Sequence, residues 1–423
     1  MRTPKSFQPV RSGTVGVIGL GYVGWPLCLL AATKGYKVEG VDIDEQKLQK
    51  LKKSLKKTAR ISVGNDFSKL QKVEVVVFCV PTPVTLKQLP DFKPLQAACA
   101  SFVPFLRQGQ LVVLESTVNP GVTEEIMLPI LEKGSGLAAG KDFFLAHCPE
   151  RINPGDPKWN VSNIPRVIGG LNKESLERGL EFYRSLLGEN VKPMNSLREA
   201  EAVKIVENAF RDVNIAFVNE LAMSFSTMDI DVVNVIEGAA TKPFSFLAHF
   251  PGCGVGGHCI PVDPYYLIER AKENGFDHDF LSLARRLNRS MPKFTAGLVV
   301  RGLNEAKIPM RDTRIAVLGL AYKPGISDDR ESPSYEIIRA LEEYGSHVVS
   351  FDPFVPQKSS VDTLGEALKG AKAVVLATGH REFQDLNPAY CKRSGVAVLV
   401  DGRNFFSKEA FQEAGIIYKG IGK

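Results

Sequence analysis

The sequence predicts an α/β protein with two Rossmann-like doubly wound domains, joined by a long central helix and a helical domain. In the first third of the chain, short apolar runs rich in β-branched residues alternate with helix-like segments, and the last third repeats that order. Between them, apolar residues recur at spacings of three and four over a long stretch. We expect the domains to cover residues 1–195, 196–305 and 306–423.

Composition narrows the class of protein. Hydrophobic residues make up 44% and charged residues 24% of the 423 residues, which is typical of a soluble globular chain. No apolar run reaches the roughly 18 residues that a membrane-spanning helix needs, and residues 1–13 lack the apolar region of a signal peptide. Seven cysteines, an odd number, favour a reducing compartment over a disulfide framework. We therefore expect a cytoplasmic protein.

The net charge of +6 includes a basic cluster between Lys47 and Arg60. Because no aromatic residues interleave with it, the cluster is better explained as a solvated helix face than as a nucleic-acid surface. The surplus charge also suits an anionic substrate. We expect no nucleic-acid or membrane partner and no metal site.

The first strand, Thr14–Ile18, leads into a G-x-G-x-x-G motif, a helix-like segment at residues 26–34, and a second strand, Lys37–Val41, which ends at Asp42. The glycines admit a pyrophosphate to the start of the helix, where free N–H groups favour anions. Asp42 would accept hydrogen bonds from the adenosine ribose and repel a 2′-phosphate, so NAD is preferred over NADP. The alternative is a purely structural glycine turn. The residues predicted to bind the cofactor here are Gly19, Gly21, Tyr22, Val23, Gly24, Asp42 and Lys47.

Hydroxyl-bearing residues follow two further buried strands, at residues 74–80 and 110–114. The carboxyl ends of parallel strands are where such sheets bind ligands, so Thr82, Ser116 and Thr117 are candidates for the cofactor edge. The alternative is that these hydroxyls only form turns, as they often do at strand ends.

The clearest helix begins at a capping box formed by Ser196 and Glu199. Lys204 and Asn208 lie four residues apart on one face, and Arg211 follows a further turn along. The alternative for these polar residues is a solvated helix edge. An apolar stripe beside them is long enough for a helix that links two domains, and it is wide enough to bury against a partner as well. The stripe comprises Val203, Val206, Phe210, Val213, Phe217 and Leu221.

Two loops bring reactive side chains together in the sequence. One places the Glu150 carboxylate beside the Arg151 guanidinium at a strand end. The other, residues 250–264, is rich in glycine and proline and holds Cys259 four residues before Asp263. A thiol and a carboxylate at this spacing suit covalent catalysis together with handling of a water or proton. The alternative is a glycine-rich surface loop with an idle cysteine.

The last third of the chain repeats the pattern of the first. Residues 314–323 resemble the first strand and its turn, but Ala321 and Lys323 break the dinucleotide motif, and residues 348–352 match the second strand and its acid. We therefore expect a second Rossmann-like domain that has lost NAD chemistry. Lys323 and Arg403, at two strand ends, are candidate anion binders, with surface ion pairing as the alternative.

Taken together, these motifs resemble the UDP-glucose/GDP-mannose dehydrogenase family over essentially the whole chain. The loop that contains Cys259 and the loop that contains Glu150 are most similar to those of enzymes that oxidise UDP-N-acetylglucosamine. Enzymes for UDP-N-acetylmannosamine are close relatives, and enzymes for UDP-glucose are more distant. The motifs lie at residues 19–24, 116–118, 149–151, 207–210, 256–264, 319–323, 330–332 and 401–403.

The resemblance implies that the C6 alcohol of the sugar is oxidised to a carboxylate with two NAD in succession. By similarity, Cys259 would form a thiohemiacetal and then a thioester, Lys204 and Asn208 would stabilise oxyanions, and Asp263 and Glu150 would handle the water. The predicted catalytic residues are Cys259, Lys204, Asn208, Asp263, Glu150 and Thr117. The predicted substrate contacts are Glu150, Arg151, Lys204, Asn208, Arg211, Phe250, Gly252, Gly256, Tyr322, Lys323 and Arg403.

The resemblance further implies that Arg330 approaches the nicotinamide and that the protein pairs through its helical region as a homodimer or larger homo-oligomer. Two positions depart from the family pattern: Cys253 replaces a common proline, and His249 replaces a usual aromatic residue. Two other functions compete with this one. A single-step NAD dehydrogenase of hydroxy acids would not need Cys259, and a non-catalytic NAD-sensing regulator would not need the set of reactive residues.

Overall fold

The structure, a computed structural model, describes residues 13–55, 60–85, 89–152 and 158–423. The chain divides into two compact units. The N-terminal unit contains the described residues up to Glu207 together with Tyr265–Asn274, and the C-terminal unit contains Asn208–Pro264 and Gly275–Lys423. The division into three domains stays a prediction. Part of the basic cluster (56–59) and part of the loop after Glu150 (153–155) lie outside the described residues.

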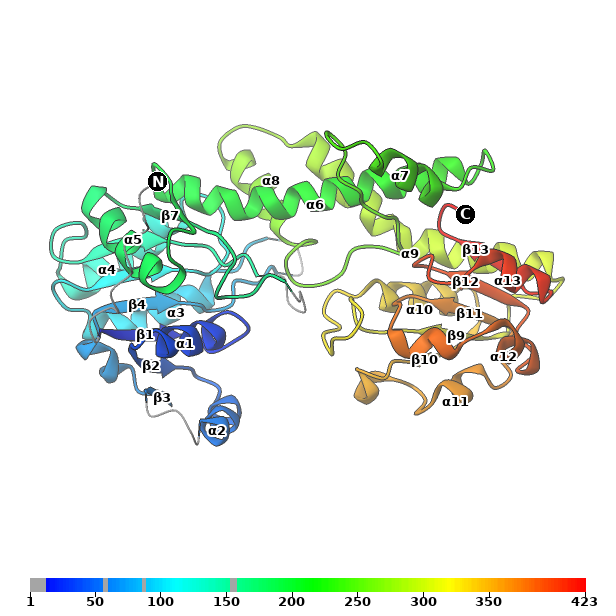
Figure 1. Cartoon of the computed structure of the whole chain (residues 1–423), viewed down its shortest axis with the longest axis horizontal. Coiled ribbons are helices and arrows are strands. Elements are labelled where there is room, and N and C mark those ends of the chain that lie inside the picture. Colours follow the sequence, from blue (N-terminus) through cyan, green and yellow to red (C-terminus); the bar gives the residue numbers. More distant parts are fainter. Residues whose placement is uncertain (1–12, 56–59, 86–88, 153–157) are drawn as a thin grey trace, which may run out of the picture. The chain divides into compact units, whose positions relative to one another are not determined.

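An eight-stranded sheet forms the centre of the N-terminal unit, in the order β3-β2-β1-β4-β5-β6-β7-β8 (Figure 1). Neighbouring strands run parallel except β6 and β7. Successive residues of β4 belong to two different cores, since Val75 and Val77 face one and Val76 and Phe78 the other. The strands are β1 (Thr14–Ile18), β2 (Lys37–Val41), β3 (Ile61–Gly64), β4 (Val75–Phe78), β5 (Leu111–Leu114), β6 (Phe144–His147), β7 (Arg166–Gly170) and β8 (Val191–Pro193).

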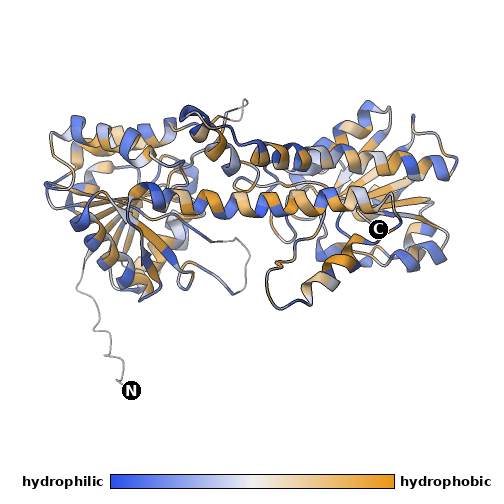
Figure 2. Cartoon of the chain, turned by 90° about the horizontal axis from the view of Figure 1, so that it is seen from above, coloured by the Kyte–Doolittle hydropathy of each residue, from blue (hydrophilic) through white to orange (hydrophobic). Residues whose placement is uncertain are grey.

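A second sheet of five parallel strands, in the order β10-β9-β11-β12-β13, forms the centre of the C-terminal unit. Its strands are apolar, like those of the first sheet (Figure 2). Because both faces of such a sheet are covered, its strands are nearly continuous apolar runs. The strands are β9 (Arg314–Leu318), β10 (His347–Phe351), β11 (Ala373–Leu376), β12 (Val398–Asp401) and β13 (Ile417–Gly420). The predicted fold class is confirmed.

Helices connect the strands within each unit. Those of the first sheet are α1 (Gly24–Thr33), α2 (Glu45–Ser54), α3 (Lys93–Phe102), α4 (Leu128–Ser135) and α5 (Lys173–Leu187). The middle of the chain holds α6 (Leu197–Phe225), α7 (Val232–Ala240), α8 (Asp263–Glu273) and α9 (Asp279–Glu305). The second sheet carries α10 (Pro333–Glu343), α11 (Leu364–Leu368), α12 (Pro388–Arg393) and α13 (Lys408–Glu413). Among the described helices, none is long and apolar enough to cross a membrane.

Helix α6 begins where the capping box predicts, since Ser196 Oγ accepts a hydrogen bond from the Glu199 N–H at 3.1 Å. The predicted apolar stripe divides into two sets: Val203, Val213 and Leu221 are half-buried within the chain, and burial of the other three residues against a partner stays a prediction. Val206, Phe210 and Phe217 are each more than half exposed. The buried residues of α6 are partly apolar and partly polar: Leu197, Ala200, Glu201, Lys204, Ile205, Ala209, Asp212, Ala216, Val218, Asn219 and Ala222.

Candidate active site

The glycine loop after β1 is shaped by two of its three glycines. Gly19 has a φ of +91°, and a Cβ at Gly24 would lie 2.0 Å from the Gly19 carbonyl oxygen, so neither position has room for a side chain. A Cβ at Gly21 would meet nothing within 4 Å. Helix α1 starts at Gly24 without a side-chain cap. The open backbone and the uncapped helix start therefore fit the pyrophosphate of a dinucleotide. Tyr22 between them is exposed and Val23 is half-buried.

Asp42 is buried at the end of β2, and three donors hold its carboxylate. They are the backbone N–H of Leu20 (2.8 Å), the backbone N–H of Asp44 (2.9 Å) and Lys47 Nζ (2.8 Å). Burial opposes ionisation, but Lys47 and the backbone donors outweigh it and keep the pKa of Asp42 below its usual range. An ionised carboxylate can accept about four hydrogen bonds, so this geometry leaves capacity for a ribose hydroxyl.

The hydroxyls at the next two strand ends are used within the protein. Ser116 Oγ donates to the Val80 carbonyl at 2.7 Å, and Thr82 Oγ1 donates to the Thr117 carbonyl at 2.6 Å. Both bonds tie the end of β4 to the end of β5. The structure thus brings Thr82, Ser116 and Thr117 together. Because the hydroxyl protons of Thr82 and Ser116 are already donated to carbonyls, these two hydroxyls could only accept hydrogen bonds from a cofactor.

Glu150 lies in a buried cluster that the sequence did not reveal. Arg166, on β7 and almost wholly buried, forms ion pairs with Glu150 and with Glu115, and Tyr183 donates to Glu115 at 2.6 Å. The other Glu150 oxygen accepts the backbone N–H groups of the two following residues. Burial raises the pKa of Glu115, against the opposing effect of Arg166. Arg166 thus supplies the positive charge that stabilises two buried carboxylates.

Arg151 is bonded to helix α6. Its Nε and one terminal nitrogen donate to the Glu207 carboxylate, and its other terminal nitrogen donates to the Pro165 carbonyl at 3.0 Å. Glu207 lies three residues after Lys204, which is itself buried. The predicted substrate contact at Arg151 is therefore fixed to the same helical turn as the candidate lysine.

Glu201, one turn before Lys204, was also missed in the sequence. Its buried carboxylate accepts the Gly121 N–H and both the N–H and hydroxyl of Thr123, the last two at 2.8 and 2.6 Å. Burial has the largest effect and raises the pKa of Glu201 to about 7. These bonds attach α6 to the loop that follows Thr117.

Residues 250–264, the cysteine loop, carry the candidate nucleophile of the C-terminal unit. Of the chain's seven cysteines, all of them described, only Cys259 is exposed. Its carbonyl accepts the N–H groups of Val262 (3.1 Å) and Asp263 (2.8 Å), so the loop folds back directly after the thiol. Asp263 is buried, and the side-chain amide of Asn208 donates to its carboxylate. The structure thus brings Asn208 and Asp263 together.

Four predicted substrate contacts also meet in two pairs within this unit. The Gly252 backbone lies against Arg403, since a Cβ there would be 2.7 Å from the guanidinium. Gly256 lies against Tyr322 in the same way, and its neighbour Gly257 donates its N–H to the Arg330 carbonyl at 3.0 Å. Phe250, Arg211 and Arg330 are exposed, whereas Lys323 is half-buried, and Arg330 pairs with Asp328.

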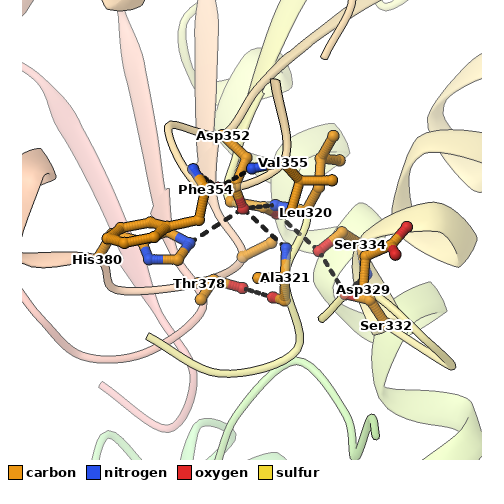
Figure 3. Close-up of polar contacts among 12 residues, drawn as sticks. Leu320, Ala321, Asp329, Ser332, Ser334, Asp352, Phe354, Val355, Thr378 and His380 are labelled. Atoms are coloured by element: carbon orange, nitrogen blue, oxygen red, sulfur yellow. Dashed lines mark hydrogen bonds and ion pairs between the residues drawn. The ribbon is translucent and has the colours of Figure 1, made fainter. Parts of the chain in front are cut away.

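Asp352, at the end of β10, forms the core of a buried polar cluster in the C-terminal unit (Figure 3). Its carboxylate accepts the N–H groups of Leu320 (2.6 Å), Ala321 (2.7 Å) and Phe354 (2.7 Å), and the His380 ring nitrogen Nε2 lies 3.0 Å away. The His380 ring is fully buried and stacks on Phe354, with ring centroids 4.8 Å apart. These donors keep the pKa of Asp352 low although burial opposes it.

Asp42 and Asp352 occupy matching places in the two units. Leu20 and Leu320 donate their N–H groups to these acids, and each acid directly follows the second strand of its unit. The third partner differs, because Lys47 near the surface is replaced by the buried His380. The acid of the second unit is therefore committed to internal contacts, which agrees with the expected loss of the dinucleotide site there.

An open glycine loop beside an ionised ribose acid is the arrangement of a nicotinamide-dependent dehydrogenase, and the residues of the N-terminal unit fit NAD. Three models of one family match the chain in order. They are the NAD binding domain (residues 13–187), the central domain (198–290) and the UDP binding domain (316–408) of the UDP-glucose/GDP-mannose dehydrogenase family. The chain belongs to this family and is an NAD-dependent UDP-sugar dehydrogenase. The predicted family, enzyme class and cofactor are confirmed.

Named relatives span nearly the whole chain. A UDP-N-acetyl-D-mannosamine dehydrogenase of Pyrococcus horikoshii is 36% identical over 425 residues, covering 97% of this chain and 99% of that protein. Its solved structure aligns with a TM-score of 0.91 over the same shares. A UDP-N-acetyl-D-glucosamine 6-dehydrogenase of Pseudomonas aeruginosa is 36% identical over 406 residues, covering 92% of this chain and 96% of that protein. The relatives thus agree on the reaction class but differ in the sugar.

Proposed function

We propose that the protein oxidises the C6 alcohol of UDP-N-acetylglucosamine to the uronic acid, in two steps that each reduce one NAD. The observation that supports this proposal is the cysteine loop, in which the exposed Cys259 is followed by a buried Asp263 that accepts a hydrogen bond from Asn208. A thiol, a carboxylate and an amide donor are the groups that an aldehyde intermediate requires for its further oxidation.

NAD, when bound, supplies the hydride acceptor for both oxidations. The first oxidation removes a hydride and a proton from the C6 alcohol and gives an aldehyde. The Cys259 thiolate then adds to the aldehyde carbon, and loss of a second hydride from that carbon converts the thiohemiacetal to a thioester. Water adds to the thioester, the carbon–sulfur bond breaks, and the acid and the free thiol are released. Each sugar therefore yields two NADH.

The other residues serve charge and proton transfer in this proposal. Lys204 and Asn208, one turn apart on α6, stabilise the oxyanions that develop in each oxidation. Asp263 accepts a proton from the attacking water, and Glu150, which forms an ion pair with Arg166, orients that water together with Thr117. Lys323 and Arg403 bind the anionic UDP and sugar side, and Arg151, Arg211, Phe250 and Tyr322 complete the contacts.

A panel of UDP-sugars, assayed for NADH production and for acid formation, tests the proposal. We expect UDP-N-acetylglucosamine to give the highest kcat/KM, with two NADH and one acid per sugar. One NADH per sugar with a stable aldehyde or ketone would refute the two-step reaction and favour a single-step dehydrogenase.

A second candidate substrate is UDP-N-acetylmannosamine. It is favoured by the relative of Pyrococcus horikoshii, whose name specifies this sugar and which matches the chain over 97% of its length. A higher kcat/KM for the manno epimer than for the gluco epimer would decide for this candidate, and the two-NADH stoichiometry would be unchanged.

We further propose that the protein is a homodimer or larger homo-oligomer that pairs through α6. Val206, Phe210 and Phe217 expose a large apolar surface on one helix, and a groove of about 510 Å³ beside them is lined by Phe210, Phe217, Phe246 and Leu247. Exposed apolar patches of this kind usually mark interaction sites. Sedimentation velocity should show a dimer or larger species, and a monomer at assay concentration would contradict the proposal.

A further inference from the structure

A chain of buried amides links the cysteine loop to helices α6 and α9 within the C-terminal unit. The Gly252 N–H donates to Asn219 Oδ1 at 3.0 Å, and Asn219 Nδ2 donates to Asn288 Oδ1 at 2.9 Å. Asn288 Nδ2 donates in turn to the carboxylate and the carbonyl of Asp212, at 2.8 and 2.9 Å. Arg285 completes the network by pairing with the Asp212 carboxylate. Asp212, Asn219 and Asn288 are at most 1% exposed.

Donors and acceptors alternate in one direction along the network, and this fixes the orientation of the side-chain amides of Asn219 and Asn288. Asp212 can only accept as a carboxylate, so Asn288 must present its nitrogen to it and its oxygen to Asn219. Asn219 must then present its nitrogen to Asn288, and its oxygen is left for the Gly252 N–H. Each of these buried groups depends on the next, so removing one leaves a donor or acceptor without a partner.

Helix α6 holds both ends of the cysteine loop on a single face. Asn208 and Asn219 are eleven residues, or three turns, apart and therefore lie on the same side of the helix. Asn219 bonds to Gly252 near the start of the loop, and Asn208 bonds to Asp263 near its end. Cys259 lies between these two attachment points.

The position of Gly252 also affects the candidate anion site. A Cβ on Gly252 would come within 2.7 Å of the Arg403 guanidinium, so the two groups are packed together. The next residue, Cys253, lies with its Sγ 3.3 Å from the Ala377 carbonyl, to which Arg403 Nε also donates at 2.7 Å. A shift of Gly252 would therefore displace Arg403 as well as the cysteine loop.

We propose that Asn219 is a positioning residue for the oxidation. Asn288 and Asp212 fix Asn219, and Asn219 holds the Gly252 backbone. Through Gly252 it sets the position of Cys259 relative to Asn208, and also the position of Arg403. This inference rests on the proposed function, in which Cys259 is the nucleophile. Asn219 touches none of the reacting atoms and acts through the loop backbone.

The test compares Asn219→Ala and Asn288→Ala with a matched control, Gln110→Ala. Gln110 is also a buried amide: its nitrogen donates to the Leu70 and Val73 carbonyls and its oxygen accepts the Arg107 N–H, but it lies at the amino end of β5 in the N-terminal unit. Turnover of the UDP-sugar, NAD affinity and hydrogen exchange of residues 250–264 are measured for each variant, together with its melting temperature.

We expect Asn219→Ala to lower kcat about a hundredfold, as a displacement of about 1 Å in a reacting group can do. NAD affinity should be unchanged, and exchange in the cysteine loop should be faster. Asn288→Ala keeps the contact between Asn219 and Gly252 and should have a smaller effect in the same direction, and it serves as the test if Asn219→Ala does not fold. Gln110→Ala should keep the wild-type kcat even if its melting temperature falls.

Wild-type turnover and loop exchange in Asn219→Ala would overturn the inference. Equal losses of kcat in Asn219→Ala and Gln110→Ala at equal melting temperatures would overturn it too, because the effect would then come from stability alone. If the wild-type protein oxidises no UDP-sugar, the proposed function fails. The exchange measurement then still decides whether Asn219 holds the loop.

Discussion

Alanine substitutions at Gly21 and Gly24, made one at a time, should separate cofactor binding from folding. A Cβ at Gly24 would lie 2.0 Å from the Gly19 carbonyl oxygen, and this backbone is held by the bond from the Gly19 N–H to Val41 at 2.8 Å. Overpacking against a fixed backbone costs about 1–3 kcal/mol or more. A Cβ at Gly21 meets nothing within 4 Å, so Gly21→Ala should change stability by less than about 0.5 kcal/mol.

For NAD affinity the order of the two variants should be the reverse of their order for stability, with Gly21→Ala the more damaging. The methyl group of Gly21→Ala occupies the space that the pyrophosphate needs, and each charge-assisted hydrogen bond that is lost costs about 1.5–3 kcal/mol. The affinity for NAD should therefore fall about tenfold to a hundredfold. Melting temperatures with and without NAD, together with a direct NAD titration, measure both effects. Gly238→Ala, at another open position on α7, is the control: it should leave NAD affinity unchanged and should not lower the melting temperature, because alanine favours a helix over glycine. Normal NAD affinity in Gly21→Ala, or wild-type melting of Gly24→Ala, would refute the reasoning.

Three further predictions concern single residues. Because a 2′-phosphate would meet the ionised Asp42, NAD should be strongly preferred, and a comparable kcat/KM with NADP would contradict the ribose contact. Cys259→Ser should still form aldehyde but little acid, whereas Lys204→Ala should slow both oxidations about a hundred- to a thousandfold. Single-turnover NADH traces and intact mass spectrometry measure both effects. Near-normal acid formation by the serine variant would exclude Cys259 as the nucleophile. Burial raises the pKa of Glu201 from 4.5 to about 7, so the unfolded chain loses this proton first. The free energy of unfolding should therefore decline between about pH 4.5 and 7, and an equally steep decline in Glu201→Gln would assign it to other groups.

Most of the strands that the sequence predicted lie inside the two sheets, although β10, at the edge of the second sheet, was predicted as well. β1 and β2 match their predicted ranges: β1 is buried at four of its five positions, and β2 at the three positions Val38, Gly40 and Val41. Of the strands that were missed, β3, β8 and β13 lie at sheet edges and have fewer buried positions, whereas β7 lies next to an edge and is buried at four of its five positions. β8 even contains a proline, which suits an edge because it cannot donate to a neighbouring strand.

The residues of the candidate site likewise divide into those that the sequence revealed and those that it did not. The glycine motif was visible because its residues are neighbours in the sequence and its geometry depends on missing side chains. Arg166 was not visible, because Glu150 lies 16 residues away and the pairing arises only when β7 returns beside β6. Asn219 meets its partners Gly252 and Asn288 at separations of 33 and 69 residues. Contacts between distant segments leave no local spacing for a sequence pattern to record.

Helix α6 shows that apolar periodicity alone does not identify which face of a helix its own domain buries. The usual inference is that the apolar side of a helix faces its own core, since burying polar groups is costly. That cost is reduced where buried polar groups have partners: one Asp212 carboxylate oxygen accepts from Asn288 and Arg285, and Asn219 bonds to Asn288 and Gly252. The inward side of α6 can then be polar and hold the cysteine loop. Three large apolar residues, Val206, Phe210 and Phe217, lie on the outer side, where a second copy of the chain could cover them.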